Sequence, residues 1–573
     1  MAPEHFTGEQ RAYYETAQRF SREEVLPRAA QLEKRDYALM RELLRKAGEL
    51  GLLMIDFPES VGGLGLDKTT SCLVAEAKSL LGSWSVTFGG HTGIGSLPIV
   101  WFGTAGQKEK YLPRLASAEW VAAYALTESG SGSDALGAKT RAVKSADGKH
   151  WVLNGSKQFI TNAGFADVFI VFAKVDGDKF TGFIVDRDTP GLTIGPEEHK
   201  MGIRGSSTCP LIFEDARVPV ENLLGEIGKG HKIAFNILNM GRLKLGVGVL
   251  GGMKMQLKNA TAYAQERKQF HTPIAQFGLI REKLARMATA TYAVESMAYR
   301  TSGLIDDRLA GEDRASPDYD ARVIAAIEEF AIEASILKVM GSESHWSLVD
   351  DGVQIHGGYG YIEEFPVERA FRDARINRVF EGTNEINRLL ITGMLLKRAM
   401  KAGLPVFDFA QAVDQELSGH SLPKPRGSDG LSDEAHAAEL LKRMAAWGLK
   451  VAAETFGLEL EKHQAVMARV SDIAMDAFAL DTIVTRTRQV AAGGNVDPVR
   501  QAMVRQFANR AHARSQEALR GVLAASCKGE VLAQQLEKAA QLSVFLPHDP
   551  DALTETIVQG VIAAGGYPFA LSA

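Results

Sequence analysis

The spacing of hydrophobic residues changes twice along the chain. Up to about residue 120 apolar positions recur every three or four residues, for example at Leu43, Leu44 and Ala47, which is typical of amphipathic helices. Short apolar runs such as 168–175 then follow, bounded by glycine and proline, which is typical of strands. Helical spacing returns after about residue 226. This order predicts a mainly α protein with an inserted β domain.

The same pattern predicts the division of the chain into domains. We expect an N-terminal helical domain (1–120), a middle β domain (121–225), a helical bundle domain (226–402), a linker (403–431) and an all-α C-terminal extension (432–573). The linker is predicted because prolines and glycines are frequent there, with prolines at 405, 423 and 425.

Composition excludes several classes of protein. Hydrophobic residues make up 45% and charged residues 24% of the chain, as in globular proteins with packed cores. The net charge of −5 provides no basic field for nucleic acid. The three cysteines are far apart, so we expect no disulfide framework and no metal site. The polar, acidic N-terminus lacks the features of a targeting peptide, and we expect a cytoplasmic protein.

One glycine motif needs a structural interpretation. Gly246, Gly248 and Gly251 match the G-x-G-x-x-G pattern of dinucleotide-binding folds, but that pattern requires a preceding strand, and residues 234–245 have helical spacing. We therefore predict that these glycines allow two helices to approach closely.

Two longer segments are more specific. YALTESGSGSD (124–134) with LNGSKQFITNAGFAD (153–167), and RVFEGTNEINRLL (378–390), resemble the signatures of the acyl-CoA dehydrogenase flavoproteins. The resemblance covers about residues 1–400 and is strongest to the very-long-chain acyl-CoA dehydrogenase subgroup, which has a helical C-terminal extension. It implies a helical N-terminal domain, a β-barrel middle domain and a four-helix bundle. It also implies oxidation of acyl-CoA to trans-2-enoyl-CoA in fatty-acid β-oxidation.

The resemblance identifies Glu381 as the catalytic base. The reaction removes a weakly acidic proton α to a thioester, for which one positioned carboxylate suffices if the carbonyl is polarised. Phe380 and Gly382 flank Glu381, and desolvation there raises a carboxylate pKa to a useful value. Some relatives carry the base on the helix that contains Gly241, but glycine has no side chain and does not compete.

The resemblance also assigns binding residues for FAD and acyl-CoA. The FAD contacts it implies are Leu126, Thr127, Ser133, Phe159, Ile160, Thr161, Arg267, Gln269, Phe270, Gln354, Gly357, Gly358, Thr383 and Glu385. Ser133, Gly241, Arg242, Phe380 and Gly382 are implied for the substrate, with Arg242 on the side of CoA. Two residues depart from the family pattern: Ser129 replaces a usual proline and Phe159 a usual tryptophan. Small residues at 89–96 are expected to form a deep floor of the acyl pocket.

Partners follow from the same resemblance. Arg267, Gln269 and Phe270 resemble residues that reach the FAD of a neighbouring subunit, which implies a homodimer. Electrons are expected to pass to an electron-transfer flavoprotein. The alternatives are an acyl-CoA oxidase, which reduces oxygen, and a non-catalytic assembly partner on the same fold.

The extension contains a basic run. Between residues 483 and 520 there are seven arginines and only two acidic residues, Asp497 and Glu517, which gives a local charge of +5. The arginines are at positions 486, 488, 500, 505, 510, 514 and 520. Peripheral membrane contact, as in the resembling subgroup, and a solvated helix face are the two interpretations of this run. The extension is also expected to cover the face that tetrameric relatives use between dimers.

Overall fold

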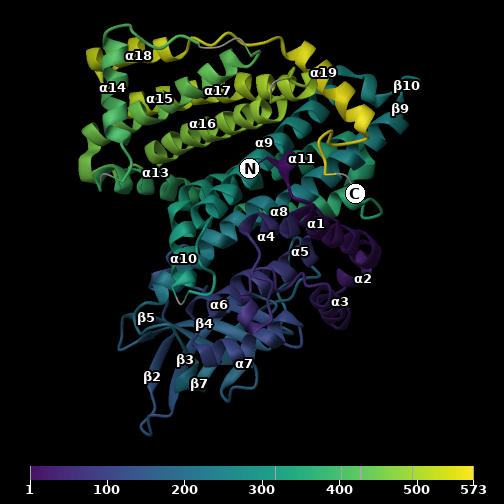
Figure 1. Ribbon diagram of the computed structural model, residues 1–573, viewed down its shortest axis with the longest axis vertical. Coiled ribbons are helices and arrows are strands. Elements are labelled where there is room, and N and C mark those ends of the chain that lie inside the picture. Colours follow the sequence, from purple (N-terminus) through teal and green to yellow (C-terminus); the bar gives the residue numbers. More distant parts are fainter. Residues whose placement is uncertain (1, 317, 402, 426–428, 493, 572–573) are drawn as a thin grey trace.

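The computed structural model describes residues 2–571 except 317, 402, 426–428 and 493. Figure 1 shows a β-sheet at one end, a layer of C-terminal helices at the other, and long helices between them. The N-terminal helices lie beside the long helices and the sheet. The prediction of a mainly α protein with an inserted β domain is confirmed.

Short helices form the N-terminal part of the chain. They are α1 (Gly8–Phe20), α2 (Ala29–Leu32), α3 (Tyr37–Glu49), α4 (Lys68–Ala77), α5 (Gly82–Gly89), α6 (Leu97–Phe102) and α7 (Ala105–Ala116). Their starts are set by polar caps: the Asp67 side chain accepts the Thr70 N–H at 2.6 Å, and Thr104 and Gln107 form a capping box. These caps satisfy amide groups that have no partner inside the helix.

The inserted domain is a single sheet. Its strands are β1 (Ala122–Ala125), β2 (Arg141–Lys144), β3 (His150–Thr161), β4 (Val168–Val175), β5 (Lys179–Asp186), β6 (Leu192–Ile194), β7 (Thr208–Pro219) and β8 (Leu223–Leu224). The hydrogen-bonded order is β6-β7-β3-β2-β4-β5-β8, and β1 pairs in parallel with β4. Alternating residues of β3, β4 and β7 pack into a separate core around Phe169 and Leu211.

Long helices form the middle of the molecule. They are α8 (Gly230–Glu266), α9 (Gly278–Leu309), α10 (Tyr319–Glu329), α11 (Ala331–His356), α12 (Pro366–Ala374) and α13 (Asn384–Met400). A hairpin of β9 (Lys268–Gln269) and β10 (Thr272–Pro273) joins α8 to α9. By length and composition α8 could cross a membrane, but 67% of its most apolar window is buried inside the protein, so it is a core helix.

Close helix packing explains the glycine motif. A Cβ at Gly246 would lie 2.5 Å from the Leu337 side chain of α11, and one at Gly251 would lie 2.4 Å from the Glu76 carbonyl of α4. Any larger side chain would force these helices apart. The prediction that the glycines serve helix packing is confirmed.

The C-terminal extension is also helical. It comprises α14 (Val406–Ser418), α15 (Ser432–Phe456), α16 (Gln464–Ala491), α17 (Pro498–Ser526), α18 (Gly529–Leu542) and α19 (Pro550–Ala564). The predicted linker (403–431) therefore contains a helix, α14, although residues 426–428 lie outside the described part. Its buried Ala410, Val413 and Leu417 recur at helical spacing, and Asp414 accepts the Trp447 indole N–H at 3.1 Å. Prolines mark only the ends of this helix.

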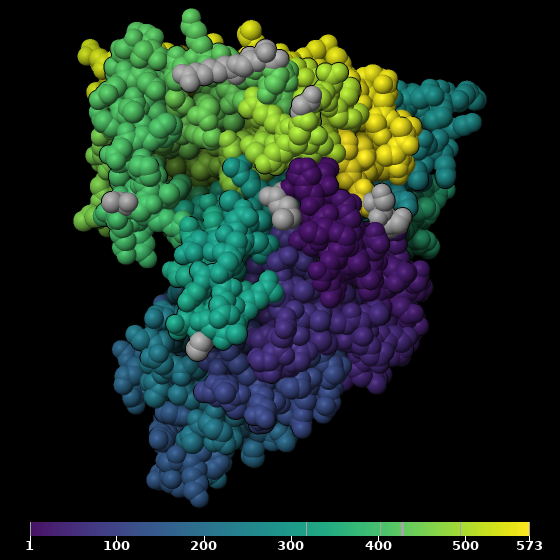
Figure 2. All heavy atoms as spheres, viewed as in Figure 1, coloured from purple at the N-terminus to yellow at the C-terminus, as the bar shows by residue number. Residues whose placement is uncertain are grey.

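The extension shares one hydrophobic core with the rest of the helices. That core runs continuously from Phe6 to Leu571, and α16, α17 and α19 all pack against α9. In Figure 2 the N-terminal segment (purple) lies directly against the C-terminal helices (yellow-green). The extension is thus part of the main body of the protein.

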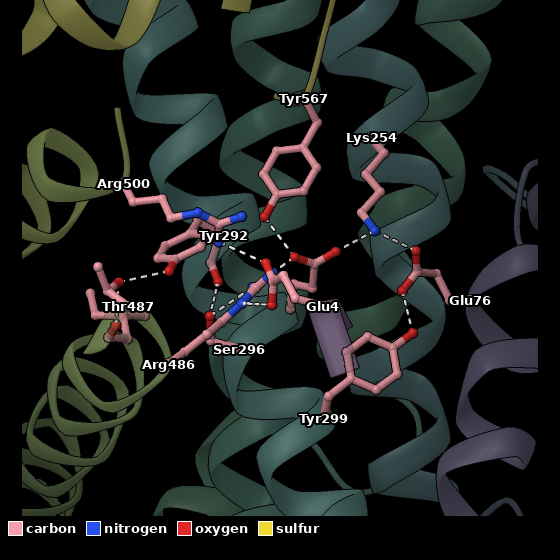
Figure 3. Close-up of polar contacts among 12 residues, drawn as sticks. Glu4, Glu76, Lys254, Tyr292, Ser296, Tyr299, Arg486, Thr487, Arg500 and Tyr567 are labelled. Carbon is pink, nitrogen blue, oxygen red and sulfur yellow. Dashed lines mark hydrogen bonds and ion pairs between the residues drawn. The ribbon is translucent and has the colours of Figure 1, made fainter. Parts of the chain in front are cut away.

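A buried polar network joins the two ends of the chain (Figure 3). Glu4 forms ion pairs with Arg486 of α16 at 2.8 Å and with Arg500 of α17 at 2.7 Å. Arg486 also binds Glu295 of α9 at 2.7 Å, and Lys254 of α8 binds Glu295 at 2.5 Å. Charges in this network are compensated, as buried ions require.

The ion pairs change the interpretation of the basic run. Six of its seven arginines pair with carboxylates within the described residues. The pairs are Arg486 with Glu4 and Glu295, Arg488 with Asp429, Arg500 with Glu4, Arg505 with Glu434, Arg510 with Glu282, and Arg514 with Asp476. Arg486 and Arg500 are buried as well. The local charge of +5 counted along the sequence is therefore largely compensated by carboxylates from other segments, which favours the structural interpretation of these arginines, and membrane contact stays a prediction.

Candidate active site

Glu381 lies on a tight turn between a short 3₁₀ helix (Arg375–Arg378) and α13. Its backbone is left-handed (φ 58°), as is that of Gly382 (φ 77°). A left-handed glutamate is unfavourable unless its surroundings hold it in place, and such residues concentrate at functional sites. The turn is therefore a candidate site by its geometry alone.

Three buried side chains hold this turn through its carbonyl groups. Asn387 Nδ2 donates to the Gly382 carbonyl at 2.8 Å and to the Thr383 carbonyl at 3.0 Å. Lys338 Nζ of α11 donates to the Gly382 carbonyl at 2.7 Å, and Arg242 Nε of α8 donates to the Glu381 carbonyl at 3.3 Å. Side chains of three helices therefore fix the turn through its backbone, and these bonds do not involve the Glu381 side chain.

The Glu381 carboxylate is buried without a hydrogen-bonding partner at Oε2 among the described residues. Burial raises the pKa of Glu381 to about 7, against the opposing effect of the nearby Arg242 and Lys338 charges. A carboxylate with a pKa near neutrality and an unoccupied oxygen is suited to accept a proton from a substrate.

Gly241 of α8 lies directly against this carboxylate. A Cβ at Gly241 would be 2.4 Å from Glu381 Oε2 and 2.7 Å from its Cδ. The absence of a side chain at Gly241 therefore gives Glu381 the space that it occupies.

A long cavity begins at Glu381. One wall is a single face of α8, with Gly241, Leu245, Gly248, Gly252 and Gln256 at intervals of three or four residues. The opposite wall comes from α4, α5 and the segment after α5, including residues 89, 90 and 92–94 of the predicted pocket floor. Five of the eight residues at 89–96 thus line the same cavity as the predicted base, together with Thr161 of the sheet domain.

The first group of predicted FAD residues lies at and just after the C-terminal ends of β1 and β3, next to this cavity. A β-bulge in β3 between Lys157 and Ile160 turns Phe159 outward, with φ 61° and a residue exposure of 58%. The Gln158 N–H binds the Thr127 carbonyl at 2.9 Å, which joins the two signature segments. An exposed aromatic face beside a threonine suits a flavin ring.

The second group lies on a different surface. Arg267, Gln269, Gly357 and Gly358 line a common pocket where the β9-β10 hairpin meets the end of α11. Phe270, at the tip of the hairpin, has a residue exposure of 88%. The hairpin projects from the body of the molecule (Figure 1). Neither of these two cavities in the described part of the chain contains residues of both groups, as expected if each FAD site is shared between subunits.

Four predicted contacts have a different environment from the one expected. Ile160 points into the sheet core and offers only its backbone, and Leu126 is also buried in a core. Arg242 is buried and donates to Asn239 Oδ1 at 2.8 Å as well as to the turn, so it positions the turn, and its role on the side of CoA stays a prediction. Thr383 caps α13 by accepting the Ile386 N–H at 3.2 Å.

The other predicted contacts are accessible. Ser133, Gln354 and Glu385 are exposed, and Phe380 lines the cavity beside Glu381. Sequence reasoning missed Lys338 and Asn387. An isolated lysine within the apolar run of α11 was the available signal for the first, because a lysine there must bury its charge.

Comparison with known proteins identifies the family. Family models of the N-terminal, middle and C-terminal domains of acyl-CoA dehydrogenase match residues 7–119, 123–216 and 228–396, and a further acyl-CoA dehydrogenase C-terminal domain matches 441–540. The chain belongs to the acyl-CoA dehydrogenase family.

Individual relatives extend this result over almost the whole chain. A probable acyl-CoA dehydrogenase of Bacillus subtilis is 47% identical and covers 99% of this chain and 95% of its own. The human very long-chain specific acyl-CoA dehydrogenase is 39% identical over 78% of this chain and 70% of its own. The crystal structure of an acyl-CoA dehydrogenase complexed with FAD from Bacillus anthracis has a TM-score of 0.97 and 46% identity, and covers 99% of this chain and 97% of that one. The family resemblance seen in the sequence is confirmed.

Proposed function

We propose that this protein is an FAD-dependent dehydrogenase of long-chain acyl-CoA thioesters, with Glu381 as the catalytic base. The observation that carries the proposal is the buried Oε2 of Glu381, which has no hydrogen-bonding partner in the described part of the chain and lies in the wall of a long cavity. Glu381 takes the proton from the α carbon of the acyl group. FAD, when bound, accepts the hydride that leaves the β carbon, and the product is a trans-2-enoyl-CoA.

The residues present fit this cofactor. Phe159 and Thr161 lie on the same strand, β3. Phe159 presents an exposed aromatic ring, and Thr161 lines the cavity. Arg267 and the paired glycines 357 and 358 supply a cation and close backbone approach for a pyrophosphate. Because these two groups occupy separate surfaces, we propose that a homodimer completes each FAD site.

The length of the cavity supports a long acyl chain. Its residues on α8 extend from Gly241 to Gln256, which corresponds to about 22 Å along the helix axis at 1.5 Å per residue. An extended chain advances about 1.2 Å per bond, so this length accommodates roughly 18 bonds. Each buried methylene is worth about 0.8 kcal/mol, which favours long chains over short ones.

The test is the reduction of bound FAD by palmitoyl-CoA and butyryl-CoA. Wild-type protein is expected to be bleached faster by palmitoyl-CoA, with a rate that rises through pH 7 because only the ionised Glu381 accepts a proton. Glu381→Gln is expected to keep FAD and bind acyl-CoA but to lose at least a thousandfold in rate, since the amide retains the shape without the base. Activity of this variant within tenfold of wild type would remove Glu381 from the mechanism.

We propose an electron-transfer flavoprotein as the acceptor, which rests on the family resemblance. Peroxide formation in air at the rate of turnover would instead indicate an acyl-CoA oxidase.

A further inference from the structure

A buried lysine lies in the wall of the acyl cavity, away from the reacting end. Lys78 follows the last turn of α4 and lines the cavity with Ser79 and Ser85. Its side chain is almost completely buried, yet it forms no ion pair with a carboxylate of the described residues. A buried ammonium group without a counter-ion is unusual, because desolvation is strongly unfavourable unless an anion compensates it.

The surroundings of Lys78 are polar but not acidic. Its Nζ donates to the Ser85 carbonyl at 2.5 Å and to Ser85 Oγ at 3.1 Å, and Ser85 Oγ is 2.8 Å from Ser79 Oγ. Two of its three N–H groups are thereby used. We refer to Lys78, Ser79 and Ser85 as the Lys78 cluster.

Nearby charges do not neutralise this lysine. Asp56, also in the cavity wall, is already shared between Lys68 at 2.6 Å and Lys244 at 2.7 Å. Burial, together with repulsion by the Lys244 charge, lowers the pKa of Lys78 to about 7. The local field is positive, so a ligand anion would be attracted to it and would raise that pKa again.

The distance between the base and the Lys78 cluster can be taken from the spacing of residues on α8. A Cβ at Gly241 would touch the Glu381 carboxylate, and a Cβ at Gly248 would lie 3.4 Å from Ser79 Oγ. These glycines are seven positions apart, two turns along the same face, which corresponds to about 10 Å. At about 1.2 Å per bond an extended acyl chain covers this distance in roughly eight bonds.

We propose that the Lys78 cluster binds a carboxylate at the far end of the acyl chain, so that monothioesters of dicarboxylic acids with about ten to twelve carbons are substrates. This inference rests on the proposed function and specifies its substrate class. A chain of this length that starts at Glu381 ends beside Lys78, and its carboxylate supplies the missing counter-ion. A simple fatty acyl chain would pass the Lys78 cluster without supplying a counter-ion or a hydrogen-bonding partner.

The experiment compares dodecanedioyl-CoA with dodecanoyl-CoA in wild-type protein and in Lys78→Met. The ratio of their kcat/KM values is expected to fall by about ten- to a hundredfold in Lys78→Met, because a charge-assisted hydrogen bond is lost for only one substrate. Lys108→Met is the matched control, since Lys108 pairs with Asp320 at 2.6 Å outside the cavity and should leave the ratio unchanged. The terminal methyl ester of the diacid should behave as dodecanoyl-CoA does in both proteins.

The alternative role for Lys78 is a purely structural tie between α4 and α5. In that case Lys78→Met lowers both kcat/KM values by the same factor, and an unchanged ratio overturns the proposal. If Lys78→Met does not fold, the wild-type profile decides: the preference for diacids should peak at about ten to twelve carbons, and a flat profile overturns the proposal. Oxidation of dodecanoyl-CoA but not of the diacid would also overturn it while leaving the proposed function intact. Oxidation of neither substrate by FAD-replete protein would refute both.

Discussion

Substitution of Gly241 by alanine tests the geometry of the base most directly. The added Cβ would lie 2.4 Å from Glu381 Oε2, whereas non-bonded atoms of this size settle at about 3.5 Å. The carboxylate must therefore move by about 1 Å. Because Asn387, Lys338 and Arg242 hold the turn by its backbone, the displacement has to occur in the Glu381 side chain.

The magnitude follows from this displacement. A misplacement of about 1 Å at a reacting group can lower the rate by about a hundredfold. That corresponds to about 2.7 kcal/mol of transition-state stabilisation. The helix itself should not suffer, since alanine is favoured over glycine inside a helix by roughly 0.5–1 kcal/mol. We therefore expect loss of activity without loss of stability.

The assay is stopped-flow measurement of flavin reduction by palmitoyl-CoA, together with the thermal midpoint Tm of each protein. Gly106→Ala is a suitable control, because Gly106 lies in α7 and a Cβ there would meet nothing within 4 Å. Gly106→Ala should retain the wild-type rate. A Gly241→Ala protein that reduces its flavin within threefold of wild type would show that the close contact does not position the base.

Two further predictions concern the shared cofactor site and the extension. Arg267→Ala should lower FAD retention and dimer stability together, measured by flavin absorbance and sedimentation, and a flavin-replete dimer of unchanged stability would contradict the shared site. Arg486→Met should lower the free energy of unfolding by about 3–5 kcal/mol, because it removes a partner of the buried Glu295. In thermal denaturation Arg520→Met is the control, since Arg520 is exposed, and equal midpoints for the two variants would refute this prediction.

Much of the fold was predictable from local sequence patterns. The change from helical to alternating spacing located the sheet, and the helical spacing before Gly246 correctly indicated helix packing rather than nucleotide binding. The helix within 403–431 was missed because prolines at 405, 423 and 425 dominate that segment, while its buried face has only three apolar positions. Prolines indicate where a helix ends, but they do not exclude a helix in the segment between them.

The site was less predictable because its assembly depends on contacts between distant segments. Glu381 was found through a family motif, but Lys338 and Asn387 act on backbone carbonyls, which any sequence possesses. The ion pairs of the arginines in the extension were missed for the same reason. Charge counted along the sequence ignores carboxylates such as Glu4, which lies 482 residues from Arg486. Lys338, within the apolar run of α11, was a signal that the sequence offered and that was not used.

The pairing of Glu4 with Arg486 has a consequence for synthesis of the chain. Its two members are separated by 482 residues, so at 5–20 residues per second the ribosome delivers the arginine roughly 25 to 100 s after the glutamate. During that interval Lys254 is the partner of Glu295 and Arg486 is still missing, and the apolar face of α9 that later receives α16, α17 and α19 is uncovered. A nascent chain that already contains Glu381 and all residues of the acyl cavity therefore lacks the helices that cover α9 until the end of synthesis. The uncovered apolar face of α9 is the surface that a chaperone would bind at this stage.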